Sequence, residues 1–350
     1  MAQGEGYEFE MKTSLARLTI ALAILVAAIS LHGCDSDNEE TPQVRVPTPS
    51  PISGSDTGSC TDGSAPDSNT GCCADSDACP KCCMGPVTAV AVKSGSKCAC
   101  VVFKQGFDEA SKGTLDENNL DILFNDPPWD NGVSDGRVAI TGQPTAFSGN
   151  ALEVLYPQGG VGPREGGAQW RLALPESHQK LFLAYWVRFA EDFDFVRGGK
   201  LPGLVGGKAN TGGNRPNGTD GWSARMMWRT DGKVVQYVYH PDQKGKSGDD
   251  LPWEFGALGQ RQFLPGTWHQ VEHCIIMNTP GQKDGKIEGW FDGNLALRQE
   301  GLRFRDVDTL AIDALYFSTF FGGSSPDWAA TKDERVVFDE FVVSTLPITH

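Results

Sequence analysis

The stretch Gly221-Trp-Ser-Ala-Arg-Met-Met-Trp-Arg229 is followed by Thr230-Asp-Gly232 and then by Lys233-Val-Val-Gln-Tyr-Val-Tyr-His240. Both longer runs are rich in aromatic and branched residues, and the Asp-Gly pair between them is typical of a turn. Successive side chains of a strand point to opposite faces, so the first run has an apolar face and a face with its serine and both arginines. The sequence therefore predicts an antiparallel hairpin with one face in a hydrophobic core.

The length of the connecting loop decides which side chains of this hairpin face each other. With a two-residue loop, Arg225 would lie opposite Val238, and both tyrosines would point away from it. With a three-residue loop, Arg225 lies opposite Tyr237 and Ser223 lies opposite Tyr239. Glycine at the last loop position is typical of a type I turn followed by a left-handed residue, which favours the longer loop. We therefore expect one polar cluster of two tyrosines, a serine and an arginine.

Two interpretations of this cluster remain open at the level of the hairpin. Cross-strand pairs of tyrosine and arginine commonly stabilise an exposed sheet surface without any further function. The same groups would also suit the centre of a binding or catalytic site.

Residues 102–350 are long enough for one sizeable core, and they repeat the strand pattern of the hairpin. Turn signals such as Pro-Gly, Gly-Gly and Asn-Gly separate short apolar runs, and no stretch keeps a helical period over three turns. Many short strands at this spacing predict an all-β fold, and the length favours a jelly-roll β-sandwich. The further predicted strands are Lys180–Phe189, Trp268–Met277, Lys286–Phe291, Ala314–Phe321 and Val336–Ser344.

The N-terminal part of the chain has the composition of an export signal and a tether. A short basic region after Met11 precedes the apolar run Leu18–Leu31, which is short for a membrane span and predicts a secretory leader over residues 1–34. Cys34 follows a glycine as in bacterial lipoprotein cleavage sites, so we expect Cys34 to carry a lipid anchor. Residues 35–59 are rich in serine, proline, threonine and acidic residues and predict a disordered linker. We therefore expect an exported protein, either secreted or anchored in the cell envelope.

Eight cysteines fall within residues 60–101. An even number of cysteines in so short a segment of an exported protein predicts a small disulfide-rich module. A thiolate metal cluster is the alternative, favoured by Cys-x-x-Cys-Cys and Cys-x-Cys spacings, but export and the lack of histidine in the segment favour disulfides. The cysteines expected in disulfides are Cys60, Cys72, Cys73, Cys79, Cys82, Cys83, Cys98 and Cys100.

The charge of the chain argues against nucleic acid as a partner and for an anionic ligand. The formal net charge of −15 has the wrong sign for binding a phosphate backbone. Residues 197–233 nevertheless hold seven lysines and arginines against two aspartates, and such a local positive field attracts anions. A solvated loop face is the alternative interpretation of this basic patch.

Six separated motifs occur in order within residues 185–341. They are Phe193-Asp-Phe-Val-Arg-Gly-Gly-Lys-Leu-Pro-Gly203, Trp222-Ser-Ala-Arg-Met-Met-Trp228, Tyr237-Val-Tyr239, Pro265-Gly-Thr-Trp-His269, Gly289-Trp-Phe-Asp-Gly293 and Phe317-Ser-Thr-Phe-Phe-Gly-Gly323. With these motifs the chain resembles polysaccharide lyase family 14, which contains alginate and glucuronan lyases built on a β-jelly roll. Several motifs in the same order are more specific than any single one, and the first 100 residues fall outside the resemblance.

The resemblance implies a lyase whose catalytic groups are a lysine in a Gly-Gly-Lys-Leu-Pro segment, a serine and an arginine two residues apart, and a Tyr-x-Tyr pair. These groups match Lys200, Ser223, Arg225, Tyr237 and Tyr239 of this chain. The implied reaction is β-elimination in an anionic, uronate-containing polysaccharide, alginate or glucuronan-like, which leaves unsaturated uronate ends. A non-catalytic carbohydrate-binding protein on the same fold is the alternative, although such a protein would not need all five groups.

The chemistry of β-elimination explains why such groups belong together. The C5 proton of a uronate becomes acidic only when the adjacent carboxylate is neutralised, and Arg225 and Lys200 can supply that positive charge. Nearby cations are expected to lower the pKa of a phenol, so Tyr237 or Tyr239 can act as base and then protonate the leaving oxygen. Lys200 is an alternative base, and the sequence leaves this choice open. Ser223 is expected to orient the substrate or a tyrosine.

Two further arginines of the basic patch, Arg197 and Arg229, are expected to contribute more weakly to substrate binding. The large domain shows no ligand set with metal spacing, so we expect neither a metal nor another cofactor. We expect a monomer whose partner is the anionic polysaccharide itself.

Overall fold

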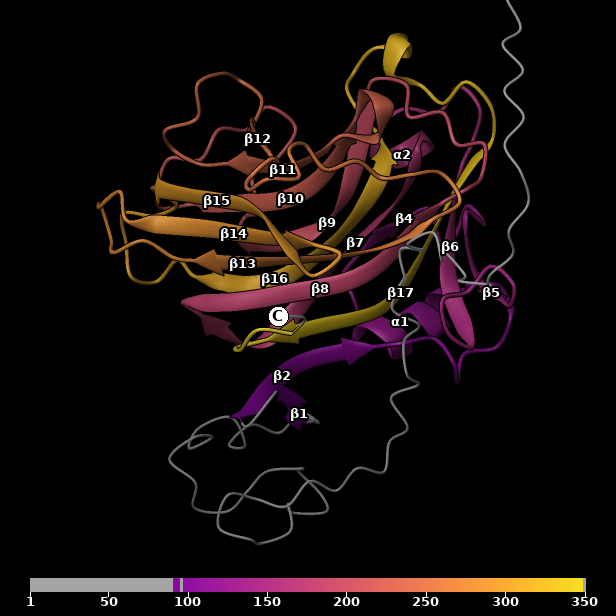
Figure 1. Ribbon diagram of the computed structural model, residues 1–350, viewed down its shortest axis with the longest axis horizontal. Coiled ribbons are helices and arrows are strands. Elements are labelled where there is room, and N and C mark those ends of the chain that lie inside the picture. The colour runs from indigo at the N-terminus through magenta and orange to yellow at the C-terminus, as the bar shows by residue number, and fades with distance from the viewer. Residues whose placement is uncertain (1–90, 95–96, 349–350) are drawn as a thin grey trace, which may run out of the picture. The chain divides into compact units, whose positions relative to one another are not determined.

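The computed structural model describes residues 91–94 and 97–348, with side chains from residue 101 onward. Two antiparallel β-sheets pack face to face in this part of the chain (Figure 1). The all-β sandwich predicted from the sequence is confirmed. No helix of the described residues is long and apolar enough to span a membrane.

The larger sheet contains ten strands and supplies one wall of the core. In the strand Lys180–Phe189 of this sheet, alternate side chains such as Leu181, Leu183 and Tyr185 point into the core. The strands lie in the order β15 (Asn294–Leu302), β14 (Gly285–Phe291), β13 (Trp268–Ile276), β8 (Lys180–Phe189), β17 (Glu334–Ser344), β6 (Asn150–Tyr156), β5 (Val138–Gly142) and β3 (Gly113–Thr114), and β2 (Lys97–Gln105) pairs with both β17 and β1 (Ala91–Ser94).

The smaller sheet contains seven strands and includes the hairpin predicted over residues 221–240. Its strands lie in the order β12 (Asp249–Pro252), β11 (Val234–Tyr239), β10 (Gly221–Arg229), β9 (Gly198–Gly207), β16 (Ile312–Phe321), β7 (Gly167–His178) and β4 (Asp130–Asn131). The hairpin of β10 and β11 therefore lies near one edge of this sheet, and β4 forms the other edge.

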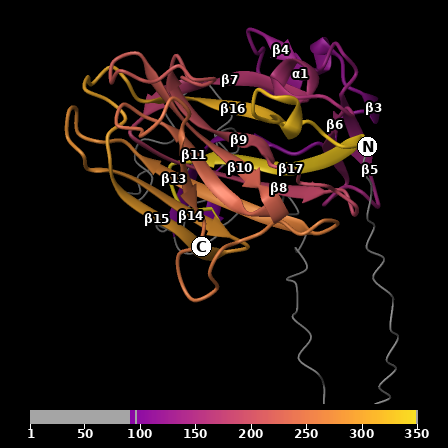
Figure 2. The same ribbon diagram turned by 90° about the horizontal axis from the view of Figure 1, so that it is seen from above.

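Short helical segments occupy the connections between these strands. Asp116 caps the first helix by accepting a hydrogen bond from the backbone N–H of Asn119 at 2.8 Å, and Phe124 packs against Trp170 at a centroid distance of 4.9 Å. Phe124 also lies 6.5 Å from Phe341 of β17, so the first helix packs against both sheets, and Figure 2 shows it next to β4. The segments are α1 (Glu117–Phe124), α2 (Gly162–Glu165) and the 3-10 turns η1 (Thr230–Gly232) and η2 (Pro326–Trp328).

Aromatic side chains fill the space between the two sheets. Trp170 of β7 stacks on Phe317 of β16 at 4.0 Å, and Trp228 of β10 meets Phe189 of β8 edge to face at 5.3 Å. Full burial of such a side chain contributes about 2–3 kcal/mol to stability. Because the core holds one face of β7, β10 and β16, the opposite face of the same strands is fixed in position.

The register of the hairpin agrees with the three-residue loop. Arg225 lies opposite Tyr237, and Ser223 lies opposite Tyr239. Trp228 faces the core, whereas Tyr237 and Tyr239 share a separate cluster on the other face. The predicted pairing of these strands is therefore confirmed.

The conformation of the loop differs in one respect from the expected type I turn. Gly232 has φ 73°, as expected for a left-handed residue, but Asp231 also has a positive φ of 62°. Aspartate tolerates this region better than most residues because its short side chain can bond locally. Two consecutive left-handed residues match the right-handed twist of paired strands, as in the turns preferred by tight hairpins.

We expect Gly232→Ala to lower the free energy of unfolding by about 2 kcal/mol or more. The new methyl group would meet both an unfavourable φ and the carbonyl oxygen of Phe263 at 2.4 Å. Gly293→Ala is the matched control, because Gly293 has φ 74° and open space at the Cβ position. Urea unfolding of both variants measures the difference, and equal destabilisation would contradict a specific role of the Phe263 contact.

Several predictions for the N-terminal region fall outside the described residues. These are the leader, lipidation at Cys34, the linker and the disulfides of the six cysteines between residues 60 and 83. The backbone of Cys98 and Cys100 belongs to β2, which continues past residue 101 and pairs with the C-terminal half of β17. The boundary expected between residues 101 and 102 therefore falls inside a strand.

Candidate active site

One face of the seven-stranded sheet, which we call the site face, lies opposite the core. On β10 and β11 it carries Arg225, Met227, Tyr237 and Tyr239, all of which are buried. Their burial is unusual for a surface hairpin, where arginine and tyrosine side chains mostly remain in water. A buried cluster of this composition is a candidate functional site rather than an ordinary exposed sheet surface.

A bulge in the neighbouring strand brings Lys200 to the site face. At Pro202 strand β9 has one residue more than β10, and beyond this point Lys200 lies opposite Met227. Without the extra residue, Lys200 would lie opposite Trp228 and point into the core. Proline has no N–H to donate, so inside a sheet it is confined to such bulges, and here its carbonyl accepts a hydrogen bond from Tyr185 at 3.2 Å.

The amine of Lys200 is enclosed by the hairpin. Its Nζ lies 2.8 Å from Sδ of Met227 and 4.0 Å from the ring centroid of Tyr237. Burial, followed by the positive charges of Arg225 and Arg229, lowers the pKa of Lys200 well below its usual value. A lysine in this environment is readily neutral and can accept a proton.

The guanidinium of Arg225 is also buried. Its Nη1 donates a hydrogen bond to Oγ of Ser318 at 3.0 Å, and the group lies over the ring of Tyr316 at 5.4 Å. Its Nε has no hydrogen-bond partner among the described residues. No carboxylate of the described ion pairs neutralises Arg225, so its positive charge is available to an anion.

The hydroxyls of the two tyrosines accept hydrogen bonds from neighbouring loops. Tyr237 accepts from the backbone N–H of Gly248 at 3.1 Å, and Tyr239 accepts from that of Gly213 at 3.1 Å. The backbone of these loops therefore fixes the position of both hydroxyls. The two rings pack edge to face at 5.5 Å.

The pKa of Tyr237 differs from the expectation that nearby cations would lower it. Burial raises this pKa to about 12, with a further contribution from Tyr239, and the charge of Arg225 offsets only part of the increase. Desolvation of the phenolate outweighs the attraction of the guanidinium. Tyr237 is therefore suited to donate a proton and not to remove one.

Ser223 has a different partner from the one expected. Its Oγ donates a hydrogen bond to the backbone carbonyl of Asn210 at 2.7 Å, and the residue is fully buried. This contact ties the loop after β9 to the hairpin. The structure therefore gives Ser223 a role in holding the loop that also contains Gly213, the partner of Tyr239.

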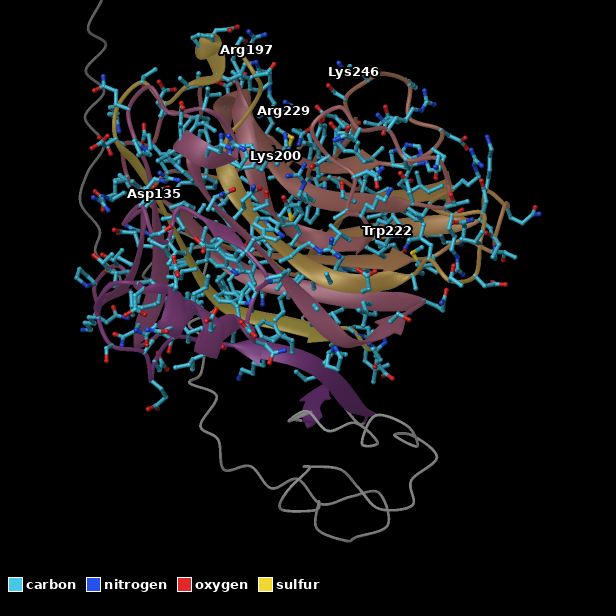
Figure 3. The ribbon with its side chains drawn as sticks, turned by 180° about the vertical axis from the view of Figure 1, so that it is seen from behind. Asp135, Arg197, Lys200, Trp222, Arg229 and Lys246 are labelled. Carbon is cyan, nitrogen blue, oxygen red and sulfur yellow. The ribbon has the colours of Figure 1, made fainter. Side chains whose placement is uncertain are left out.

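The two arginines assigned to weaker substrate binding each pair with an aspartate. Arg229 forms two hydrogen bonds with Asp250, at 2.6 and 2.8 Å, and Arg197 pairs with Asp327. Both guanidinium groups also lie over the indole of Trp328, that of Arg197 at 5.1 Å and that of Arg229 at 5.6 Å. Figure 3 shows Arg197, Arg229 and Lys200 in the same region of the domain. These aspartates lie outside residues 197–233, so the basic excess of that segment is partly neutralised in space.

Sequence reasoning missed three residues that contact the predicted groups. Met227 contacts the amine of Lys200, and Ser318 and Tyr316 contact Arg225. A signal for the last two was present, because alternation along the strand predicted over residues 314–321 places them on one face.

The comparisons with known proteins concern the family and the fold of the chain. A model of the family described as Polysaccharide lyase 14 matches residues 144–341. The solved alginate lyase Aly36B in complex with alginate tetrasaccharide, a variant with a lysine and a tyrosine changed to alanine, is 26% identical with a TM-score of 0.60 over 71% of this chain and 98% of its own. The marine alginate lyase from Aplysia kurodai is 27% identical with a TM-score of 0.59 over 70% and 99%. No curated protein matches the chain.

Proposed function

The chain belongs to polysaccharide lyase family 14, and from that premise we propose that it is an exported enzyme that cleaves alginate by β-elimination. The observation that carries the proposal is a pair of adjacent groups on the site face with oppositely shifted pKa values. Lys200 has a lowered pKa and Tyr237 a raised one, and the amine lies 4.0 Å from the phenol ring. When the environment shifts the pKa values of two neighbouring groups in opposite directions, an amine with a lowered pKa is suited to act as base and a phenol with a raised pKa as acid.

Lys200 acts as the base in this proposal. Its neutral amine takes the C5 proton of a uronate, and the electron pair of the broken C–H bond forms the double bond between C4 and C5. The bond between C4 and the bridging oxygen breaks, and Tyr237 donates its proton to that oxygen. The backbone N–H of Gly248, already bonded to the hydroxyl of Tyr237, stabilises the phenolate that remains.

Arg225 acts on the substrate carboxylate. Negative charge moves onto this carboxylate as the C5 proton leaves, and a positive group already held in place stabilises it without reorganisation. Arg225 is buried, is fixed by Ser318 and forms no ion pair within the described part of the chain, so it meets this requirement. Arg229 is less suited because Asp250 already occupies its guanidinium.

Alginate is the favoured substrate because the two similar structures from Aly36B and from Aplysia kurodai are alginate lyases. In the Aly36B complex, a lysine and a tyrosine were replaced by alanine when alginate tetrasaccharide was bound. These are the residue types that the proposal assigns to proton transfer in this chain.

We expect the enzyme to raise the ultraviolet absorbance of alginate solutions as unsaturated uronate ends form. The panel consists of mannuronate-rich and guluronate-rich alginate blocks, glucuronan and a neutral glucan. The neutral glucan should give no signal, because without a C5 carboxylate its C5 proton is not acidic. Binding of alginate without any rise in absorbance would contradict the proposal and favour the non-catalytic carbohydrate-binding protein.

Export is supported by the leader predicted over residues 1–34. It would bring the enzyme to an extracellular polymer that cannot enter cells. Fractionation of bacteria that express the full chain tests this part, and recovery of the protein only from the cytoplasm would contradict it.

A further inference from the structure

Trp129 is the only tryptophan among the exposed large hydrophobic residues of the described chain, with 40% of its surface accessible. A single exposed hydrophobic side chain is common on protein surfaces, so exposure alone assigns no role. The contacts of Trp129 decide the question. They connect the indole to the site face.

The backbone holds Trp129 in a defined place. It follows Pro127 and Pro128, whose rings fix their backbone angles, and it precedes the edge strand β4. Within β4, Asp130 pairs with Trp170 and Asn131 pairs with Gln169 of β7. Figure 2 shows β4 next to α1 and β7 at this side of the sheet. The indole is therefore presented by ordered backbone, which limits the entropy lost when a ligand binds.

Tyr316 links Trp129 to the centre of the proposed reaction. The rings of Trp129 and Tyr316 pack edge to face, with centroids 6.0 Å apart and planes at 89°. The same ring of Tyr316 lies under the guanidinium of Arg225, at 5.4 Å from its centroid. In an edge-to-face pair at least one broad face of the indole stays free of its partner. Trp129 thus lies two contacts away from the group that binds the reacting carboxylate, on the same side of the sheet.

A line of hydrogen bonds runs alongside these contacts. The hydroxyl of Tyr316 donates to Oε1 of Gln169 at 2.9 Å, and Nε2 of Gln169 donates to Oδ1 of Asn131 at 2.9 Å. Tyr316 and Gln169 are both buried. These two hydrogen bonds link polar side chains of β16, β7 and β4 and hold the sheet surface between Arg225 and Trp129 in place.

We propose that Trp129 is a stacking platform for a uronate of the bound polymer that lies some distance from the linkage being cleaved. Sugar rings have apolar C–H faces, and an indole held beside polar groups binds such a face while the groups around it meet the hydroxyls. The inference rests on the proposed function, because it takes the polymer at Arg225 as its starting point. Trp129 also lies outside residues 144–341, so this platform is not part of the segment that matches the family.

The test compares Trp129→Ala with wild type on alginate polymer and on the shortest oligosaccharide that wild type cleaves. We expect KM for the polymer to rise about fivefold to tenfold, with kcat within twofold of wild type. KM for the short substrate should not change, because that substrate does not reach the platform. Trp129→Phe should restore part of the affinity, since a smaller aromatic face remains.

Phe255→Ala is the matched control. Phe255 is 43% exposed and lies beside Arg298 of β15, in the other sheet, at 5.3 Å. This variant should keep the wild-type KM on both substrates. Wild-type KM in Trp129→Ala, or an equal loss on both substrates, would overturn the inference.

A binding measurement separates this inference from the proposed function. Calorimetric titration with alginate polymer is carried out on Lys200→Met and on Lys200→Met with Trp129→Ala, after thermal unfolding has shown equal stability. Weaker binding by the double variant supports the platform, and equal binding overturns it. Failure of wild type to cleave any uronate polymer would instead contradict the proposed function, whatever the titration shows.

Discussion

Lys200→Met is expected to lower kcat on alginate by a factor of about a thousand, because general base catalysis contributes roughly 10²–10⁴-fold. Methionine has a similar length and no charge, so it should fill the space beside Met227 and Tyr237 and leave the sheet intact. KM should change little if the substrate carboxylate is bound mainly by Arg225. Initial rates from ultraviolet absorbance measure the effect, and circular dichroism checks the fold.

Lys200→Arg decides between the two roles that the sequence left open for this residue. If Lys200 only neutralised the substrate carboxylate, arginine would keep the positive charge and much of the rate. A base must be neutral, and an arginine side chain stays protonated, so we expect Lys200→Arg to lose as much activity as Lys200→Met. Retention of more than about a tenth of the wild-type rate by the arginine variant would contradict the assignment of Lys200 as base.

The pH dependence of wild type follows from the same two groups. Lys200 must be neutral, so the rate should rise with pH as its amine loses a proton. This rise in rate should occur at a pH well below the usual pKa of a lysine, because burial lowers the pKa of Lys200. Tyr237 must keep its proton, and its pKa of about 12 ensures that it does so throughout the neutral and moderately alkaline range.

The pairing of the hairpin could be predicted from sequence because it depends only on loop length and on the alternation of side chains along each strand. Side chains alternate along a strand, so the length of one loop determines whether Arg225 meets Tyr237 or Val238. Tertiary structure could not change this without breaking the hairpin. The detailed turn was harder to predict, since Asp231 and Gly232 both adopt left-handed angles and aspartate does not require them.

The alternation of side chains could not by itself predict which face of the sheet Lys200 occupies, because one bulge moves its side chain to the opposite face. Strand β9 was not predicted as a strand, since Gly198-Gly-Lys-Leu-Pro-Gly-Leu-Val-Gly-Gly207 is poor in residues that favour strands. The structure explains one of these glycines: a Cβ at Gly203 would lie 2.3 Å from the carbonyl oxygen of Ala224. Pro202 in this run was the available signal for a bulge, but its consequence for Lys200 depends on which strand lies next to it.

The pKa of Tyr237 could not be predicted from neighbouring residue types. Sequence indicated the cations that lower a phenol's pKa, but not how far the loop that contains Gly248 would exclude water from it. Burial depends on segments distant in the chain, so the sign of the total shift appears only in the folded protein.

His273 provides the second large effect, on stability in acid. It lies on β13, is fully buried between the core residues Val271 and Ile275, and neither ring nitrogen has a hydrogen-bond partner among the described residues. Burial lowers the pKa of His273 to about 3, whereas an unfolded histidine has its usual value of about 6.5. Between these values the unfolded chain binds a proton that the folded chain does not, so stability must fall as the pH falls.

The size of this effect is roughly 3 kcal/mol between pH 7 and pH 4, since each pH unit below about 6.5 contributes about 1.4 kcal/mol. The wild-type curve alone does not isolate it, because the buried carboxyl of Asp339 has a pKa raised to about 7 and therefore stabilises the fold as the pH falls. We therefore compare wild type with His273→Leu, which retains Asp339 and has a similar core volume. Urea unfolding should show the variant gaining roughly 3 kcal/mol relative to wild type on going from pH 7 to pH 4. If the difference in unfolding free energy between the two proteins did not change with pH, His273 would bind protons equally well in the folded and unfolded chains, and the prediction would be wrong.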